Sequence, residues 1–221
     1  IQKWSLVIIG QNVYKGNENM KDKINLDDPK TRYPREVHTE PISHKSYEPV
    51  YNIINEIFTP SSIADLGCRC GHLISHFYKQ NLDVLGIDYF KYDYLRDDIK
   101  EHFIQHDLRN SISDIVDKKY DIIVSTEVAE HIDPDYEHIY IENIKHLMHE
   151  NSKLIISWAD GVVNHQHFNP KTSIEFKQLM EDYNFICLED ESNKILNHFK
   201  NNVNKATHNY LLGAVSVWQL K

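Results

Sequence analysis

Residues 62–71 read SIADLGCRCG, an apolar run that ends in two glycines four positions apart. A short apolar run followed directly by glycine predicts a buried strand over 62–66 and then a tight turn. Gly67 lets the backbone approach a ligand closely, and Gly71 opens the next helix, whose first N–H groups have no partner within that helix. A strand, a glycine turn and a helix in this order predict a ligand-binding edge of an α/β sheet.

The rest of the chain alternates between strand-like and helix-like patterns. Strands are predicted at 62–66, 83–87, 102–106, 120–125, 153–158, 185–188 and 211–218, and helices near 47–58, 71–80, 92–100, 111–117, 135–149 and 171–182. The continuous apolar runs at 122–124 and 154–156 are typical of parallel strands buried on both faces. The polar stretch 189–208 predicts a loop, which favours an antiparallel final strand. We therefore predict a doubly wound, Rossmann-like α/β sheet, mostly parallel, with an antiparallel last strand.

The composition and the net charge argue against several classes of function. The 221 residues include 24 Lys and Arg against 33 Asp and Glu, and the net charge of −9 argues against nucleic acid as a partner. No apolar stretch approaches the length of a membrane span, so we expect no membrane partner. The three cysteines, Cys68, Cys70 and Cys187, have no CxxC spacing, which favours free thiols in a reducing compartment and a cytoplasmic location.

The first 40 residues differ in pattern from the rest of the chain. Residues 1–40 hold one short apolar run and then a polar stretch, which predicts an N-terminal extension or lid before a domain at 41–221. The sequence opens at Ile1 without a methionine. We therefore expect this chain to be fused to further domains in a longer polypeptide.

Acidic and hydroxyl side chains follow the predicted strands at the edge where an α/β sheet binds its ligand. Asp88 comes 23 residues after Asp65, in the place where a carboxylate can accept both hydroxyls of a ribose. Asp107 and Leu108 follow the third strand, and Ser125 ends the fourth. These positions predict a nucleotide site.

This set resembles the class I S-adenosylmethionine-dependent methyltransferases over roughly residues 45–221. The resemblance implies that the glycine turn holds the methionine part of the cofactor, the acid after the second strand its ribose, and the acid after the third its adenine. The implied cofactor-binding residues are Asp65, Gly67, Cys68, Gly71, Asp88, Tyr89, Asp107, Leu108 and Ser125. Arg69 replaces the family's usual central glycine. An NAD-binding domain or a plain structural turn is the alternative, although the GxGxxG fingerprint of NAD sites is missing.

A second set of residues follows the fourth strand. If a helical turn starts at Glu127, then Glu127, Glu130 and His131 share one face and can bind one cation. The loop after the fifth strand contains His165, His167 and Asn169 and can supply another ligand.

This pattern resembles a metal-dependent subset known from small-RNA 3′-terminal ribose methylation and quinone-ring O-methylation, and the later loop resembles glycan-associated methyltransferases. The implied ligands of Mg²⁺, Mn²⁺ or Zn²⁺ are Glu127, Glu130, His131 and His167. A simple helix start at Glu130 and His131 is the alternative.

A cation beside a methyl donor would assist methyl transfer to a hydroxyl group. A sugar hydroxyl is a poor nucleophile, and a bound divalent ion makes it more acidic. We therefore predict an S-adenosylmethionine-dependent O-methyltransferase that acts on a sugar, a glycan or another hydroxylated small molecule with metal assistance, and in which His167, His165 and Glu130 are catalytic. The alternatives are methylation of an RNA-terminal ribose or of a small-molecule phenol, and a non-catalytic cofactor-binding scaffold.

Overall fold

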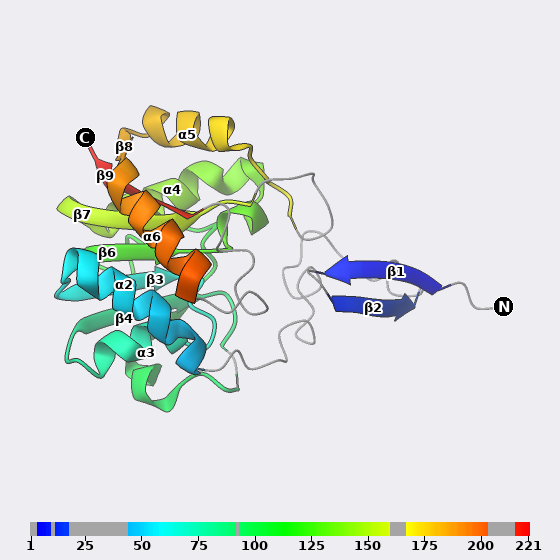
Figure 1. Cartoon of the computed structure of the whole chain (residues 1–221), viewed down its shortest axis with the longest axis horizontal. Coiled ribbons are helices and arrows are strands. Elements are labelled where there is room, and N and C mark those ends of the chain that lie inside the picture. The colour runs from blue at the N-terminus through cyan, green and yellow to red at the C-terminus, as the bar shows by residue number, and fades with distance from the viewer. Residues whose placement is uncertain (1–3, 10–11, 18–43, 92, 160–166, 203–214) are drawn as a thin grey trace. The chain divides into compact units, whose positions relative to one another are not determined.

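The computed structural model describes residues 4–9, 12–17, 44–91, 93–159, 167–202 and 215–221. The chain divides into two units, Ile1–Ile42 and Ser43–Lys221. In the first unit, β1 (Trp4–Ile9) and β2 (Asn12–Asn17) form an antiparallel pair (Figure 1). A lid function for residues 1–40 stays a prediction.

The described part of the second unit is built on a seven-stranded sheet in the order β5-β4-β3-β6-β7-β9-β8. The strands are β3 (Ser62–Leu66), β4 (Asp83–Asp88), β5 (Phe103–Gln105), β6 (Tyr120–Ser125), β7 (Met148–Ser157), β8 (Phe185–Cys187) and β9 (Val215–Leu220). From β5 to β7 all neighbours are parallel, and β9 is antiparallel to both β7 and β8. This confirms the predicted doubly wound sheet with an antiparallel last strand.

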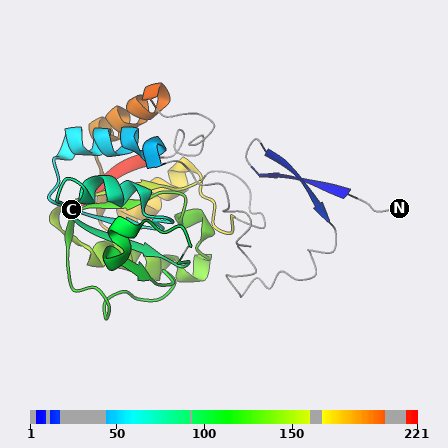
Figure 2. The ribbon, with the colours of Figure 1, turned by 90° about the horizontal axis from the view of Figure 1, so that it is seen from below.

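Helices cover both faces of this sheet. The α-helices are α2 (Glu48–Phe58), α3 (His72–Tyr78), α4 (Glu137–His146), α5 (Ser173–Asp182) and α6 (Glu189–Asn202). One buried cluster joins α2, α3 and α6 to the sheet, and a second joins α4 and α5 to its other face. In Figure 2, α2 (cyan) and α6 (orange) lie on the same side of the sheet.

Helix boundaries follow local signals. Thr172 and Glu175 form a reciprocal capping box that starts α5. Thr59 adopts a left-handed conformation, with φ of 46°, at the end of α2 and directly before Pro60, which cannot continue the helix.

Three local predictions are wrong. The stretch 189–208 contains α6, whose buried residues Ser192, Ile195 and Phe199 are spaced by three and four positions. The segment 111–117 contains a turn at 113–115 instead of a helix, and the N–H of Ile112 before this turn donates to the Asn143 side chain (3.0 Å). Of the helix predicted near 92–100, the described residues show only a 3₁₀ turn at Asp97–His102. In addition, β7 starts at Met148, five residues earlier than the predicted strand.

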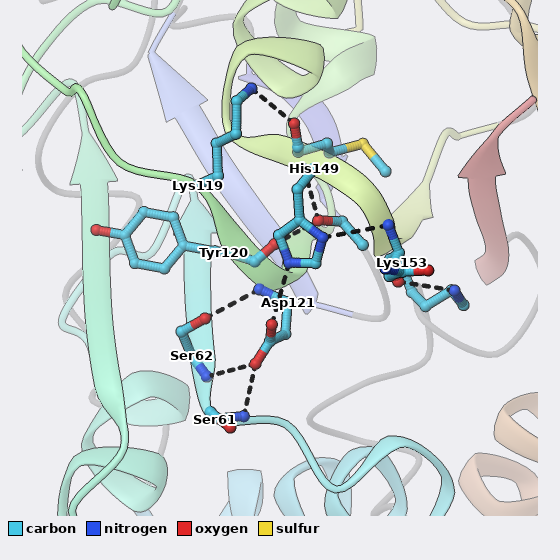
Figure 3. Close-up of polar contacts among 10 residues, drawn as sticks. Ser61, Ser62, Lys119, Tyr120, Asp121, His149 and Lys153 are labelled. Atoms are coloured by element: carbon cyan, nitrogen blue, oxygen red, sulfur yellow. Dashed lines mark hydrogen bonds and ion pairs between the residues drawn. The ribbon is translucent and has the colours of Figure 1, made fainter.

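Asp121 of β6 forms hydrogen bonds to the start of β3 and to His149 of β7, at the amino end of the sheet (Figure 3). One carboxylate oxygen accepts hydrogen bonds from the backbone N–H groups of Ser61 (2.7 Å) and Ser62 (3.1 Å), and the other lies 3.1 Å from Nε2 of His149. Burial alone would raise the pKa of Asp121, but the bonds from Ser61, His149 and Ser62 outweigh it and lower the pKa. The ionised carboxylate therefore stabilises the folded state.

We expect Asp121→Ala to lower the free energy of unfolding at pH 7 by about 1–3 kcal/mol, because the two N–H groups lose their acceptor. A lowered pKa gives stability that is present above the unfolded pKa of about 3.9 and lost as the pH falls through the folded pKa. The difference from wild type should therefore shrink in acid. Urea unfolding between pH 3 and pH 8 measures this. Asp117→Ala, at an exposed position, is the control, and equal stability of Asp121→Ala and wild type at pH 7 would refute the assignment.

Candidate active site

The glycine-rich turn connects β3 to α3. The N–H groups of Gly67 and Cys68 both donate to the carbonyl oxygen of Ile87, at 2.7 and 3.2 Å, which fixes the turn to the end of β4. Gly67, Arg69 and Gly71 all adopt left-handed conformations, with φ of 83°, 51° and 71°. A Cβ at Gly67 would overlap the Val128 side chain, and one at Gly71 would overlap Ile99. A larger residue at either glycine would therefore both clash with a neighbouring side chain and adopt an unfavourable backbone conformation.

Asp88 lies at the end of β4, directly beside this turn. Its Oδ2 accepts a hydrogen bond from the N–H of Arg69 (2.8 Å), and its Oδ1 accepts one from the N–H of Phe90 (2.9 Å). Burial raises the pKa of Asp88, and these bonds oppose the rise. The carboxylate is thus held in a fixed orientation, and its remaining lone pairs can accept the hydroxyls of a ribose.

Asp65 is buried at the end of β3, close to Asp88. Burial first, and repulsion by the Asp88 charge second, raise the pKa of Asp65 to about 7. The neighbouring thiol of Cys68 is also buried, and burial raises its pKa well above the usual value. At neutral pH the turn therefore holds a neutral thiol and a carboxyl group that is close to its titration point.

We expect Asp65→Asn to make stability less dependent on pH. An acid whose pKa is raised on folding binds its proton more tightly in the folded state, so stability falls as the pH rises from about 4 to about 7. Asparagine cannot ionise, and the variant should gain stability relative to wild type across this window. Thermal unfolding at pH 5 and pH 8 compares them. A variant with the same pH slope as wild type would show that Asp65 does not titrate in this range.

The other predicted cofactor residues lie at the same edge, with partners of their own. The Asp107 carboxylate forms a two-pronged pair with Arg109, with a shortest distance of 2.7 Å. The carbonyl of Tyr89 accepts from Gln105, and that of Leu108 from Asn143. The hydroxyl of Ser125 is fully buried between the Leu66 carbonyl (3.0 Å) and the Tyr140 hydroxyl (2.7 Å). Cofactor contacts by these residues stay predictions.

Three of the predicted metal ligands come together beyond β6. Candidate ligand atoms of Glu130, His131 and His167 all lie within 4.8 Å of one another. The rings of His131 and His167 are 5.1 Å apart and nearly perpendicular. Glu130 is fully buried, with the Glu127 carboxyl and the backbone of Ala159 close to its carboxyl group. Within the described residues, neither of its carboxylate oxygens makes a hydrogen bond of good geometry. A buried carboxylate in this state, beside two imidazoles, fits a cation.

Glu127 takes a different position from the one predicted. The expected helical turn over 127–131 is wrong, because the 3₁₀ helix covers only Ala129–His131 and Glu127 is left-handed, with φ of 59°. Its N–H donates to the Ser157 hydroxyl at 2.8 Å. Glu127 lies outside the three-residue group but close to Glu130. Burial raises the pKa of both carboxyls, and the Glu127 charge raises that of Glu130 further.

The loop that carries His167 is anchored from two sides. The N–H groups of Phe168 and Asn169 donate to the Glu130 carbonyl, at 2.9 and 3.1 Å. The Asn169 side chain donates to Glu137 (2.7 Å), and Lys171 pairs with the same carboxylate at 2.7 Å. These bonds keep His167 beside Glu130. His165 lies outside the described residues.

Sequence reasoning placed Asn169 in this loop but missed Glu137, Lys171 and Ser157 as supporting residues. Glu137 and Lys171 are ordinary charged residues of a helix start and a loop, so nothing in the sequence marked them. Ser157 follows an apolar strand run, and its place at the strand end was the available signal.

A glycine turn and an acid at the binding edge of a doubly wound sheet are typical of folds that bind a nucleotide-like cofactor. A family model described as "Methyltransferase domain" matches residues 44–190, more than half of the chain. The chain therefore belongs to this family, and the prediction of an S-adenosylmethionine-dependent methyltransferase is confirmed. A search of curated proteins found no match.

Solved structures agree on the fold. The 1,6-didemethyltoxoflavin-N1-methyltransferase of Burkholderia thailandensis is similar with a TM-score of 0.62 at 14% identity, over 99% of this chain and 96% of that one. The plantazolicin methyltransferase BamL gives 0.58 at 18%, over 92% and 97%. A TehB-like S-adenosylmethionine-dependent methyltransferase of Corynebacterium glutamicum gives 0.56 at 19%, over 84% and 92%. Separately, none of the described helices combines the length and the apolar character that crossing a membrane requires.

Proposed function

We propose that this chain methylates a hydroxyl group of a sugar or glycan, with S-adenosylmethionine as donor and a divalent cation as an aid. The observation that carries the proposal is the buried Glu130 carboxylate, which makes no hydrogen bond of good geometry within the described residues and lies beside His131 and His167. Burial favours the neutral form of this carboxyl, and a bound cation would favour its ionised form instead. The acidic net charge favours a small acceptor over nucleic acid.

The cofactor would lie over the glycine turn. S-adenosylmethionine supplies a methyl group on a good leaving group, so the protein mainly has to position the acceptor. Asp88 accepts the ribose hydroxyls, while Gly67 and Gly71 leave room for the methionine part. The Burkholderia thailandensis enzyme and BamL were both solved with S-adenosylhomocysteine, which supports the same cofactor here.

The cation would be held by Glu130, His131 and His167. Mg²⁺, Mn²⁺ and Zn²⁺ all accept mixed carboxylate and imidazole ligands. The positive charge would make an acceptor hydroxyl more acidic. Glu127 lies next to this group, where its carboxylate can accept a hydrogen bond from the acceptor. In this proposal His165, or a ring nitrogen of His167 that is not bound to the cation, takes the acceptor proton.

Radiolabelled methyl transfer to a panel of sugars with vicinal hydroxyls tests this proposal. Each reaction is run with added Mg²⁺ or Mn²⁺ and again after exhaustive chelation. We expect transfer with metal and a loss of at least about 100-fold without it, since such an ion contributes several kcal/mol. Transfer to the sugars at an unchanged rate after chelation would overturn the role of the cation.

A second candidate is transfer to a nitrogen or a phenol without a metal. The adjacent carboxyls of Glu127 and Glu130 favour it, because two buried acids with raised pKa can share one proton and act as a general base. The Burkholderia thailandensis relative is named as an N1-methyltransferase. Chelation-resistant transfer to an amine or phenol, with no transfer to sugars, would select this candidate.

A further inference from the structure

Three polar side chains lie in a row on one side of α4. Glu137, Tyr140 and Asn143 are spaced by three positions, and side chains at this spacing are neighbours on a helix surface. Tyr140 and Asn143 are buried, and the Glu137 side chain is only 16% exposed. Apolar side chains could cover the sheet without the penalty of burying polar atoms. The row therefore indicates a role beyond packing.

Asn143 holds the loop that follows β5. Its Nδ2 donates to the carbonyl oxygens of Leu108 (3.0 Å) and Asn110 (2.9 Å), and its Oδ1 accepts a hydrogen bond from the N–H of Ile112 (3.0 Å). One buried side chain thus fixes three backbone groups of this loop. The loop begins at Asp107, so Asn143 sets the conformation of the segment in which the sequence predicts contacts to adenine.

Glu137 holds the loop that carries His167. Its carboxylate accepts a hydrogen bond from Nδ2 of Asn169 (2.7 Å) and pairs with Lys171 (2.7 Å). The Lys171 ammonium also donates to Oδ1 of Asn169 (3.1 Å), which closes a ring of three side chains. The indole N–H of Trp158 donates to the Asn169 carbonyl (2.5 Å). This ring lies directly after His167 in the chain, so Glu137 sets the place of this candidate cation ligand.

Tyr140 lies between these two residues on α4 and contacts the centre of the site. Its hydroxyl is 2.7 Å from the hydroxyl of Ser125, which donates to the Leu66 carbonyl (3.0 Å) directly before the glycine turn. Helix α4 is thus hydrogen-bonded, directly or through Ser125, to segments at the ends of β3, β5, β6 and β7. The donor half and the cation half of the site therefore share one helix as their support.

We propose that Asn143 and Glu137 are positioning residues of this methyltransferase, Asn143 for the donor and Glu137 for the cation. The inference rests on the proposed function, because the cation is part of it. A general structural role would affect both ligands alike. A positioning role predicts a split, since Asn143 bonds to the loop of the donor half and Glu137 to the loop of the cation half.

Two dissociation constants, measured for each variant, test the proposal. Calorimetric titration gives the constant of S-adenosylhomocysteine, and paramagnetic relaxation gives that of Mn²⁺. For Asn143→Leu we expect S-adenosylhomocysteine to bind at least about tenfold more weakly, because three backbone groups lose their partner, and Mn²⁺ to change less than about twofold. For Glu137→Gln we expect Mn²⁺ to bind about tenfold more weakly, because Lys171 loses its ion partner, and S-adenosylhomocysteine to change less than about twofold.

Two further variants keep the result clear. Asn143→Asp preserves the shape and the acceptor for Ile112 but loses the N–H groups that bond to the loop, and we expect S-adenosylhomocysteine to bind at least about threefold more weakly. This variant decides the donor half if Asn143→Leu does not fold. Glu142→Gln is the matched control for Glu137→Gln, with the same substitution at an exposed position of the same helix, and it should leave both constants unchanged.

Equal weakening of both ligands by either variant would show a general structural role and overturn the proposal, as would no weakening of either ligand. If wild type binds Mn²⁺, these results leave the proposed function intact. Wild type that binds S-adenosylhomocysteine but no Mn²⁺ would overturn the proposed cation and with it the role of Glu137. The S-adenosylhomocysteine constants of the Asn143 variants would then still decide the donor half.

Discussion

Glu130→Gln is expected to abolish methyl transfer while the protein remains folded. Glutamine has nearly the same shape as glutamate but no negative charge, so the cation would lose its buried anionic ligand. A contribution of about 3 kcal/mol corresponds to a rate loss of more than about 100-fold. The measurement is the initial rate of labelled methyl transfer at saturating Mn²⁺, together with the Mn²⁺ dissociation constant from paramagnetic relaxation.

The control for this prediction is Glu142→Gln. Glu142 lies on α4, is largely exposed and pairs with Lys145 at 2.8 Å. The control should keep the wild-type rate and Mn²⁺ affinity. Thermal unfolding of Glu130→Gln should occur at or above the wild-type temperature, because burial penalises the charged carboxylate that it removes. Unaltered Mn²⁺ affinity in Glu130→Gln would refute the assignment of Glu130 as a ligand.

Asp88→Ala is expected to weaken S-adenosylhomocysteine binding by roughly 100-fold, as for two lost hydrogen bonds to a charged acceptor. The reason is twofold, since the ribose loses its acceptor and the N–H groups of Arg69 and Phe90 lose the carboxylate that orders the turn. Calorimetric titration of the apoprotein measures the effect.

Asp97→Ala is the matched control for Asp88. Asp97 begins the 3₁₀ helix after β4, is exposed and pairs with Lys100. Asp97→Ala removes an acid that has no hydrogen bond to the turn in this structure, so the dissociation constant of S-adenosylhomocysteine for this variant should equal that for wild type. If both variants bound equally well, the acid after β4 would have no part in cofactor binding.

Much of the fold could be predicted because buried parallel strands have a clear sequence pattern. The runs at 122–124 and 154–156 both lie in the centre of the sheet. Helix α6 was missed because its polar positions outnumber its buried ones, although Ile195 and Phe199 carried a weak helical period. Before the turn at 113–115, the N–H of Ile112 bonds to Asn143, a partner that is distant in sequence and that a local pattern does not reveal.

The candidate site was predictable as a set of residues but not as a geometry. The glycines, Asp88 and the Glu130–His131 pair all follow strands, and the order of strands in the sheet is enough to bring them to one edge. The left-handed backbone of Glu127 depends on a hydrogen bond to Ser157 of β7, a partner from another strand. The anchoring of His167 likewise depends on Glu137 and Lys171, which have no motif of their own.

We propose that one edge of the sheet binds both the methyl donor and a divalent cation. Anomalous diffraction from crystals grown with S-adenosylhomocysteine and Mn²⁺ tests it most directly. We expect a manganese peak in contact with Glu130, His131 and His167, and cofactor density over the turn from Gly67 to Gly71 with its ribose on Asp88. Cofactor density without a manganese peak at these three residues would contradict it.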